Sequence, residues 1–213
     1  FERSDWCVAV GGSGLYLRAL CEGFDPLPQP LPAVREALNE RLNREGIETL
    51  AAELQRKDPQ YAASCDLKNP QRVIRALEVM QTTGTTMSEQ QTNATANRPF
   101  NIHKIALLPP REWLYERINH RVDEMIAAGL LEEVKSLLSY SDANALKTVG
   151  YAEIIDHLDG KLDLPQAIEK IKQHTRNYAK RQYTWFRNKG AYHPLTEWNS
   201  DEVYKQLIEG RFV

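Results

Sequence analysis

The spacing of apolar positions in the first half of the chain predicts one strand followed by helices. Residues 5–10 (DWCVAV) form a short apolar run that enters a glycine turn, which is the pattern of a buried parallel strand. Helical spacing follows at 32–44 and 48–57. It returns at 71–83, where Asn69 is the expected N-cap. The threonine-rich stretch 87–97 lacks either period and is expected to be a loop.

In the second half of the chain, some stretches have the apolar spacing of strands and others that of helices. A strand is expected at 103–108, and a long helix at 111–140 with an Ala-Gly interruption at 127–129. The remaining expected elements are a short helix at 152–158, a long helix starting at Pro165, a strand at 191–195 and a helix at 201–209. This alternation predicts an α/β fold that is rich in helix.

Prolines mark a boundary early in the chain. Residues 25–32 (DPLPQPLP) contain four prolines and must form an extended connector. We therefore expect a mostly helical insertion domain at 27–98, with 1–26 and 99–213 forming the α/β core. At 213 residues, the chain is long enough for both.

Composition narrows the class of protein. The net charge of −2 means that any attraction for nucleic acid must come from local basic patches. The three cysteines are scattered without zinc-binding spacing, which favours reduced thiols and a cytoplasmic protein. No apolar run is long enough to cross a bilayer, so no membrane partner is expected.

The strongest charge pattern lies at 170–189, which holds seven Lys or Arg residues and no acid. Helical spacing puts Lys172, Arg176, Lys180 and Arg187 on one face. A nucleic-acid backbone would relieve the repulsion within this face, and nearby aromatic residues could stack on unpaired bases. The alternative is a solvated basic face above an aromatic core stripe.

Two further patterns could bind an anion. The turn Gly11–Gly14 joins a strand to a helix, a layout that exposes backbone N–H groups, although no Gly-Lys-Ser/Thr closes it. Arg117 and Arg121 lie one helical turn apart, just beyond an expected strand. A turn without ligand, and pairing of both arginines with neighbouring acids, are the competing interpretations.

Several stretches in this order resemble the bacterial tRNA dimethylallyltransferases. They are VGGSGLYL (10–17), NPQRVIRALEV (69–79), RINHR (117–121), KTVGY (147–151) and TRNYAKRQYTWFR (175–187). The family usually has Thr where Ser13 stands, and the hydroxyl is kept. The resemblance implies a P-loop-kinase-like core, a parallel sheet flanked by helices, with a helical insert.

The resemblance also implies a reaction. Family members transfer a dimethylallyl group from dimethylallyl diphosphate to N6 of adenosine 37, beside the anticodon of tRNA, and give i6A. The base is flipped into a channel to meet the donor. Mg²⁺ is the implied cofactor, without ligands in this chain, and we expect a monomer that binds the anticodon stem-loop.

Site residues follow from the same resemblance. Arg121 and Ser13 take catalytic roles, and Arg121, Gly11 and Gly12 are expected at the diphosphate. The residues expected to contact tRNA are Arg35, Gln71, Arg72, Val73, Ile74, Arg75, Lys147, Thr148, Val149, Gly150, Tyr151, Ala152, Lys180, Arg181, Gln182, Tyr183, Thr184, Trp185, Phe186 and Arg187.

The beginning of the sequence departs from the family pattern. The family's phosphate-binding loop and its catalytic Asp precede the glycine turn, and neither occurs in these 213 residues. We therefore expect the chain alone to bind tRNA weakly and not to catalyse transfer. The alternatives are a non-catalytic RNA-binding fragment and a nucleotide-kinase-like protein in which Arg117 and Arg121 act on ATP phosphates.

Overall fold

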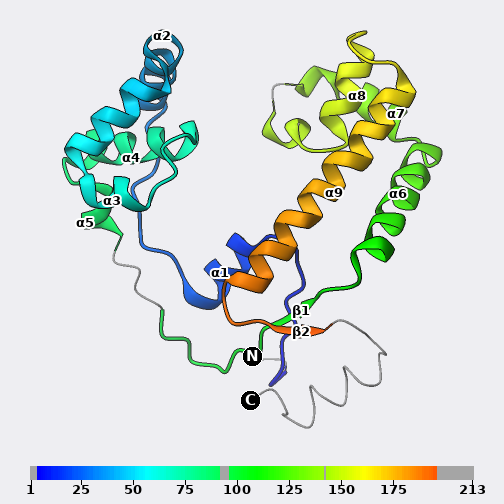
Figure 1. The fold of residues 1–213 in the computed structure, drawn as a ribbon, viewed down its shortest axis with the longest axis horizontal. Coiled ribbons are helices and arrows are strands. Elements are labelled where there is room, and N and C mark those ends of the chain that lie inside the picture. The colour runs from blue at the N-terminus through cyan, green and yellow to red at the C-terminus, as the bar shows by residue number, and fades with distance from the viewer. Residues whose placement is uncertain (1–3, 92–95, 142, 196–213) are drawn as a thin grey trace. The chain divides into compact units, whose positions relative to one another are not determined.

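The computed structural model describes residues 4–91, 96–141 and 143–195, and it divides into two compact units (Figure 1). Unit 1 joins residues 1–17 to 101–213, and unit 2 is formed by residues 18–100. The expected insert at 27–98 lies within unit 2. Helix α1 (Gly14–Glu22) crosses from one unit into the other.

Unit 2 is helical, with α2 (Pro32–Lys57), α3 (Pro59–Ser64), α4 (Pro70–Thr83) and α5 (Met87–Gln90). Within α2, Gly46 has φ 80° and ψ 166°, so a kink separates the two helices that the sequence predicts there. The Asn69 side chain accepts a hydrogen bond from the backbone N–H of Arg72, which confirms the predicted cap of α4. Gly84 ends α4 in the left-handed conformation that glycine adopts without strain.

Helix α5 differs from the expected loop at 87–97. Thr86 accepts a hydrogen bond from the Glu89 backbone N–H, and the Glu89 side chain accepts one from Thr86 in return. This capping box starts a helical turn that hydrophobic periodicity does not reveal. Met87 anchors the turn in the core at 1% exposure.

The core of unit 2 lies mainly between α2 and α4. Each helix contributes one apolar stripe, as its spacing predicts. The most deeply buried members are Leu38, Leu50, Leu54, Val73, Ile74, Leu77 and Val79.

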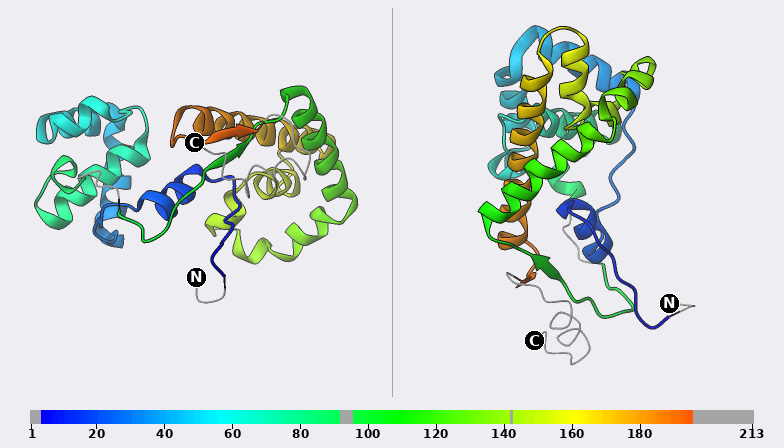
Figure 2. Two further views of the ribbon diagram at one scale, coloured as in Figure 1. Left: turned by 90° about the horizontal axis from the view of Figure 1, so that it is seen from below. Right: turned by 90° about the vertical axis from the view of Figure 1, so that its right-hand side faces the viewer.

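Unit 1 contains a small parallel sheet and several helices (Figure 2). Its described elements are β1 (Ile105–Leu107), α6 (Arg111–Ala127), α7 (Leu130–Ser136), the 3₁₀ turns η1 (Leu138–Tyr140) and η2 (Asn144–Lys147), α8 (Tyr151–Leu158), α9 (Leu164–Asn188) and β2 (His193–Leu195). Strand β1 pairs with β2 in parallel, with Ile105 opposite His193 and Leu107 opposite Leu195. The helices from α6 to α9 form the crossover that parallel pairing requires. The predicted α/β class is thereby confirmed.

Residues 5–10 correct one prediction. They form no strand, and Val8 and Val10 are 82% and 93% exposed. No described strand forms backbone pairing with this segment, so the segment does not join the sheet.

The expected break in the long helix is present. Gly129 has φ 99° between α6 and α7, and the helix ends at Ser136 rather than at 140. Val122, Val134, Ile154 and Ile171 pack together, so α6, α7, α8 and α9 share one core. The helix predicted at 201–209 lies outside the described residues.

Candidate nucleic-acid interface

Helix α9 carries most of the candidate residues. Asp163 caps its N-terminus by accepting a hydrogen bond from the Gln166 backbone N–H at 2.7 Å, and Pro165 occupies the first turn. The helix is 25 residues long, and its faces differ in burial, charge and contacts.

One face is bound to α6. Lys172 Nζ lies 2.7 Å from Asp123 Oδ1, and Arg176 donates to Asn119 Oδ1 at 2.5 Å. The hydrogen bond that Lys172 donates to Asp123 raises the pKa of Lys172. Two of the four cations expected on a single free face are therefore engaged within the protein. That part of the prediction is corrected.

A second face contacts the glycine turn. Gln182 donates from Nε2 to the Gly12 carbonyl at 2.8 Å. A Cβ added at Gly14 would lie 2.0 Å from Trp185 Nε1, so glycine is needed for the indole to fit there. Gln182 and Trp185 thus hold the turn, although both were expected to contact tRNA.

The other aromatic residues of this segment belong to the core. Tyr183 is 8% exposed, and Phe186 packs edge-on against Tyr192 at a centroid distance of 5.0 Å. Burial raises the pKa of Tyr183, and its hydroxyl has no hydrogen-bond partner among the described residues. A base cannot stack on Tyr183 in this arrangement, because a buried ring offers no open face, whereas Phe186 is only partly buried.

The remaining face is exposed and basic. Lys180, Arg181, Thr184 and Arg187 all lie on it and form no ion pair with another described residue. The Arg181 guanidinium lies 5.5 Å from the ring centroid of Tyr178, which is 44% exposed. This exposed basic face can meet phosphates with its cations, and Tyr178 beside Arg181 is an exposed aromatic ring on which an unpaired base could stack.

The turn before α8 presents a second exposed segment. Lys147, Thr148 and Val149 are exposed, whereas Gly150 is buried with φ 103°. Tyr151 donates its hydroxyl hydrogen bond to Glu133, and Ala152 donates its backbone N–H to Thr148. Only Lys147–Val149 are thus freely available to a large ligand.

The tRNA contacts predicted on helix α4 also include both exposed and buried residues. Gln71 and Arg72 are exposed in its first turn. Val73 and Ile74 are 0% and 1% exposed, so their side chains belong to the core of unit 2. Helical spacing turns these two side chains inward, and the contact of this segment with tRNA stays a prediction.

Two predicted arginines share one buried carboxylate. Glu78 is fully buried, and it accepts hydrogen bonds from Arg35 at 2.9 and 2.6 Å and from Arg75 at 2.7 Å. Arg75 also donates to the Pro28 carbonyl at 2.7 Å, which fixes the proline-rich connector to α4. Arg35 and Arg75 are thus engaged within unit 2, and their contacts with tRNA stay predictions. The hydrogen bond from Arg35 lowers the pKa of Glu78.

The two arginines of α6 differ from each other. Arg117 lies over the ring of Trp113 at 4.8 Å. Arg121 is exposed and bonds to no described residue, so the alternative of pairing with neighbouring acids does not hold for it. Gly11 is exposed and Ser13 is partly buried before α1. The catalytic roles expected of Arg121 and Ser13 stay predictions, as do the diphosphate contacts expected of Arg121, Gly11 and Gly12.

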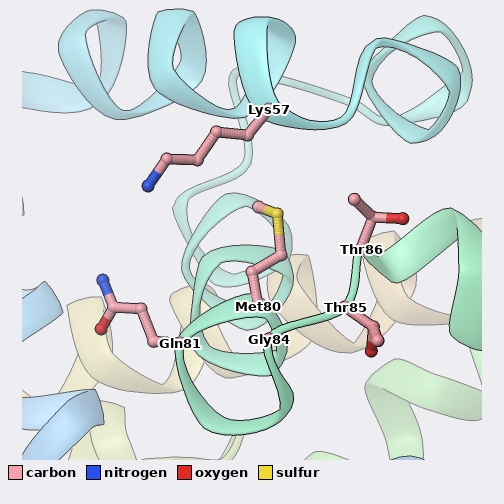
Figure 3. A pocket seen from close by; sticks show the side chains of 6 residues that line it. All are labelled: Lys57, Met80, Gln81, Gly84, Thr85 and Thr86. Carbon is pink, nitrogen blue, oxygen red and sulfur yellow. The ribbon is translucent and has the colours of Figure 1, made fainter.

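None of the predicted site residues lines the pocket of about 410 Å³ found within unit 2. Lys57 borders it from α2, and Met80 and Gln81 border it from α4 (Figure 3). The described residues contain no cluster of three or more His, Cys, Asp or Glu that could hold a metal ion. No described helix is long and apolar enough to span a membrane.

Sequence reasoning missed the acids and amides that organise these surfaces. Glu153, Glu78 and Asn119 each bond to residues distant in sequence. Glu153 stands three residues after Gly150, which is the N3 spacing of a capping acid and could have identified it. Nothing in the local pattern marks Glu78 or Asn119.

Comparisons with known proteins agree on one family. The family model described as IPP transferase matches residues 1–189. The chain is 48% identical over 187 residues to tRNA dimethylallyltransferase 1 of Bacteroides thetaiotaomicron, covering 88% of this chain and 61% of that protein. It is 46% identical over 210 residues to the tRNA dimethylallyltransferase of Christiangramia forsetii, covering 98% and 68%.

Solved structures give the same result. The full-length tRNA isopentenylpyrophosphate transferase of Bacillus halodurans matches with a TM-score of 0.55 and 35% identity, over 92% of this chain and 63% of that one. A eukaryotic dimethylallyltransferase acting on tRNA matches with a TM-score of 0.68 and 25% identity, over 95% and 57%. The chain therefore spans about three fifths of the length of most of these relatives.

Proposed function

The chain belongs to the IPP transferase family, and on that premise we propose that it forms the RNA-binding part of a tRNA dimethylallyltransferase. The proposed reaction, in a protein of the relatives' length, modifies N6 of adenosine 37 to i6A. Dimethylallyl diphosphate is the proposed donor. The proposal includes a monomer acting in the cytoplasm.

The exposed basic face of α9 carries this proposal. Lys180, Arg181 and Arg187 have no acidic partner among the described residues, and like charges so close repel one another. An RNA backbone supplies the compensating charge. Because Tyr183 is buried and Trp185 and Phe186 are partly buried, we propose that backbone contacts dominate and that base stacking is limited to Tyr178.

The proposed chemistry gives Arg121 one task. N6 of adenine attacks the allylic carbon, the bond from that carbon to the diphosphate oxygen breaks, and N6 loses a proton to a base. The departing diphosphate gains negative charge, which an unpaired guanidinium stabilises through directed hydrogen bonds. Arg121 is available for this because it is exposed and bonds to no described residue.

Magnesium is implied by the family, but the described residues supply no carboxylate cluster to hold it. They do not fit a Mg²⁺ site by themselves, and no step is assigned to the ion.

Binding of a synthetic anticodon stem-loop tests the proposal directly. Titration of the chain with a labelled stem-loop should saturate, and a blunt duplex of the same length and base composition should bind more weakly, because the duplex offers no unpaired loop. Equal binding of both RNAs, or none, would contradict the proposal. Prenyl transfer to the same stem-loop by a protein of the relatives' length would then test the reaction.

A kinase-like function is the second candidate, because Arg117 and Arg121 are both exposed on α6. ATP and the stem-loop separate the candidates. If ATP displaces a bound stem-loop, the result favours a phosphate site shared by both ligands. If ATP leaves the bound stem-loop in place, the result favours a separate RNA surface.

A further inference from the structure

Glu153 joins two of the exposed RNA-facing segments through a buried carboxylate. One oxygen, Oε2, accepts the backbone N–H of Gly150 at 2.7 Å. The other, Oε1, lies 2.5 Å from Nδ1 of His174 in α9. Glu153 is 5% exposed and its bond to Gly150 is buried, whereas the His174 side chain is 47% exposed, so only the bond to Gly150 is shielded from water.

The two partners belong to separate elements. Gly150 ends the turn that exposes Lys147–Val149, and its φ of 103° is a conformation that only glycine adopts without strain. His174 precedes Lys180 by six residues, a rise of about 9 Å along the same helix. One carboxylate therefore connects the exposed turn to the helix that carries the exposed basic face.

Among the described residues, no other hydrogen bond or ion pair links this turn or the start of α8 to α9. Thr148 donates its hydroxyl hydrogen bond to Ala145, which is local to the turn. The apolar contacts between α8 and α9, through Ile154 and Ile171, lie deeper in the core. Glu153 and His174 thus add a polar link between the turn and α9 to the apolar packing of α8 on α9.

We propose that Glu153 and His174 are positioning residues for RNA binding, which hold the Lys147–Val149 turn and the α9 cations in register for one RNA. The inference rests on the proposed function, since it presumes that both segments bind the same molecule. Prior placement of the turn removes an ordering cost that binding would otherwise carry. Neither side chain needs to touch the RNA.

A double-mutant cycle in the 213-residue chain separates this role from direct contact. Stem-loop affinity is measured for the wild type, His174→Ala, Lys147→Ala and the double variant. If His174 acts by positioning the turn, the loss caused by Lys147→Ala should shrink by about threefold or more in the His174→Ala background, at the lower end of coupling within one network. Additive losses would overturn the proposal.

Two further variants serve as controls. His174→Asn keeps an N–H donor close to the position of Nδ1, so coupling to Lys147 should return. His120→Ala removes an exposed histidine that pairs with Glu124 on α6, and its effect should add to that of Lys147→Ala. Failure of the Asn variant to restore coupling, although it unfolds at the wild-type temperature, would also contradict the inference.

The outcomes distinguish the two levels of the proposal. If the wild type does not bind the stem-loop, the proposed function fails and the inference fails with it. If the wild type binds and the cycle is additive, the function stands and only the positioning role is lost. A fall in the melting temperature of His174→Ala without coupling to Lys147 would show that the contact of His174 with Glu153 stabilises the fold and does not position the turn.

Discussion

The Gln182 amide donates a hydrogen bond to the Gly12 carbonyl at 2.8 Å, across 170 positions of sequence. Beside it, Trp185 lies where a side chain at residue 14 would have to be. These contacts join the glycine turn to α9. The side of α9 that carries Gln182 and Trp185 is therefore used to hold the turn, and the proposed RNA contacts of α9 fall on its exposed basic face.

This contact predicts a sharp difference between two glycines. Gly14→Ala should destabilise the protein by about 1–3 kcal/mol, because the new methyl group would overlap the indole of Trp185. Gly11→Ala is the matched control, since nothing lies within 4 Å of its added Cβ. Urea unfolding measures both, and equal stability of the two variants would contradict the packing.

Tyr183→Phe should leave stem-loop affinity unchanged and raise the free energy of unfolding by about 1 kcal/mol, because it removes a buried hydroxyl that lacks a partner. Tyr178→Ala, at the exposed ring beside Arg181, should instead weaken stem-loop binding. Titration and thermal unfolding of both variants provide the check. A large loss of affinity in Tyr183→Phe would return that residue to the RNA surface.

The Glu78 cluster predicts a pH-dependent loss of stability. Glu78→Gln should cost about 2 kcal/mol at neutral pH, the scale of a hydrogen bond to a charged group. Since the folded pKa of Glu78 lies below its ordinary value of 4.5, this contribution is complete above that pH. It is lost as the pH falls through the lower folded value.

The gap in stability between wild type and Glu78→Gln should therefore close in acid. Glu36→Gln changes an exposed glutamate on α2, the helix of Arg35, and should have little effect at any pH. Denaturant unfolding across the acid range measures all three proteins. A gap that stays constant with pH would contradict the role of ionised Glu78.

For the proposed transfer reaction, Arg121→Ala in a protein of the relatives' length should lower kcat by about 10²–10³, the usual loss when one donor to a developing charge is removed. Stem-loop affinity should change little. Arg117→Ala is the control one turn away, because that guanidinium already lies over Trp113. Loss of RNA affinity alone in Arg121→Ala would remove its leaving-group role.

Hydrophobic spacing and capping residues were sufficient to predict most elements. Asn69, Gly84 and Gly129 act locally, so their effects can be seen in the sequence. The exposed residues among the predicted tRNA contacts could not be told from the buried ones by sequence, because the family motifs contain inward-facing and outward-facing residues together. Val73 and Tyr183 stand beside exposed residues in those motifs and yet are buried.

Contacts between residues distant in the sequence explain the remaining wrong predictions. Lys172 and Arg176 fit the charged face by helical spacing, and only the packing of α6 shows that Asp123 and Asn119 engage them. Residues 5–10 have the composition of a strand, but strand formation requires a neighbour that no local pattern supplies. Tertiary contacts decided each of these cases.

The salt dependence of stem-loop binding tests the central claim most directly. Lys180→Ala and Arg181→Ala should each weaken binding and reduce the slope of log K against log salt by about 1, as expected for a lost phosphate contact. Lys172→Ala, on the same helix but paired with Asp123, should leave the slope unchanged. If Lys180→Ala and Arg181→Ala keep the wild-type slope, the exposed face of α9 is a solvated surface and does not bind RNA.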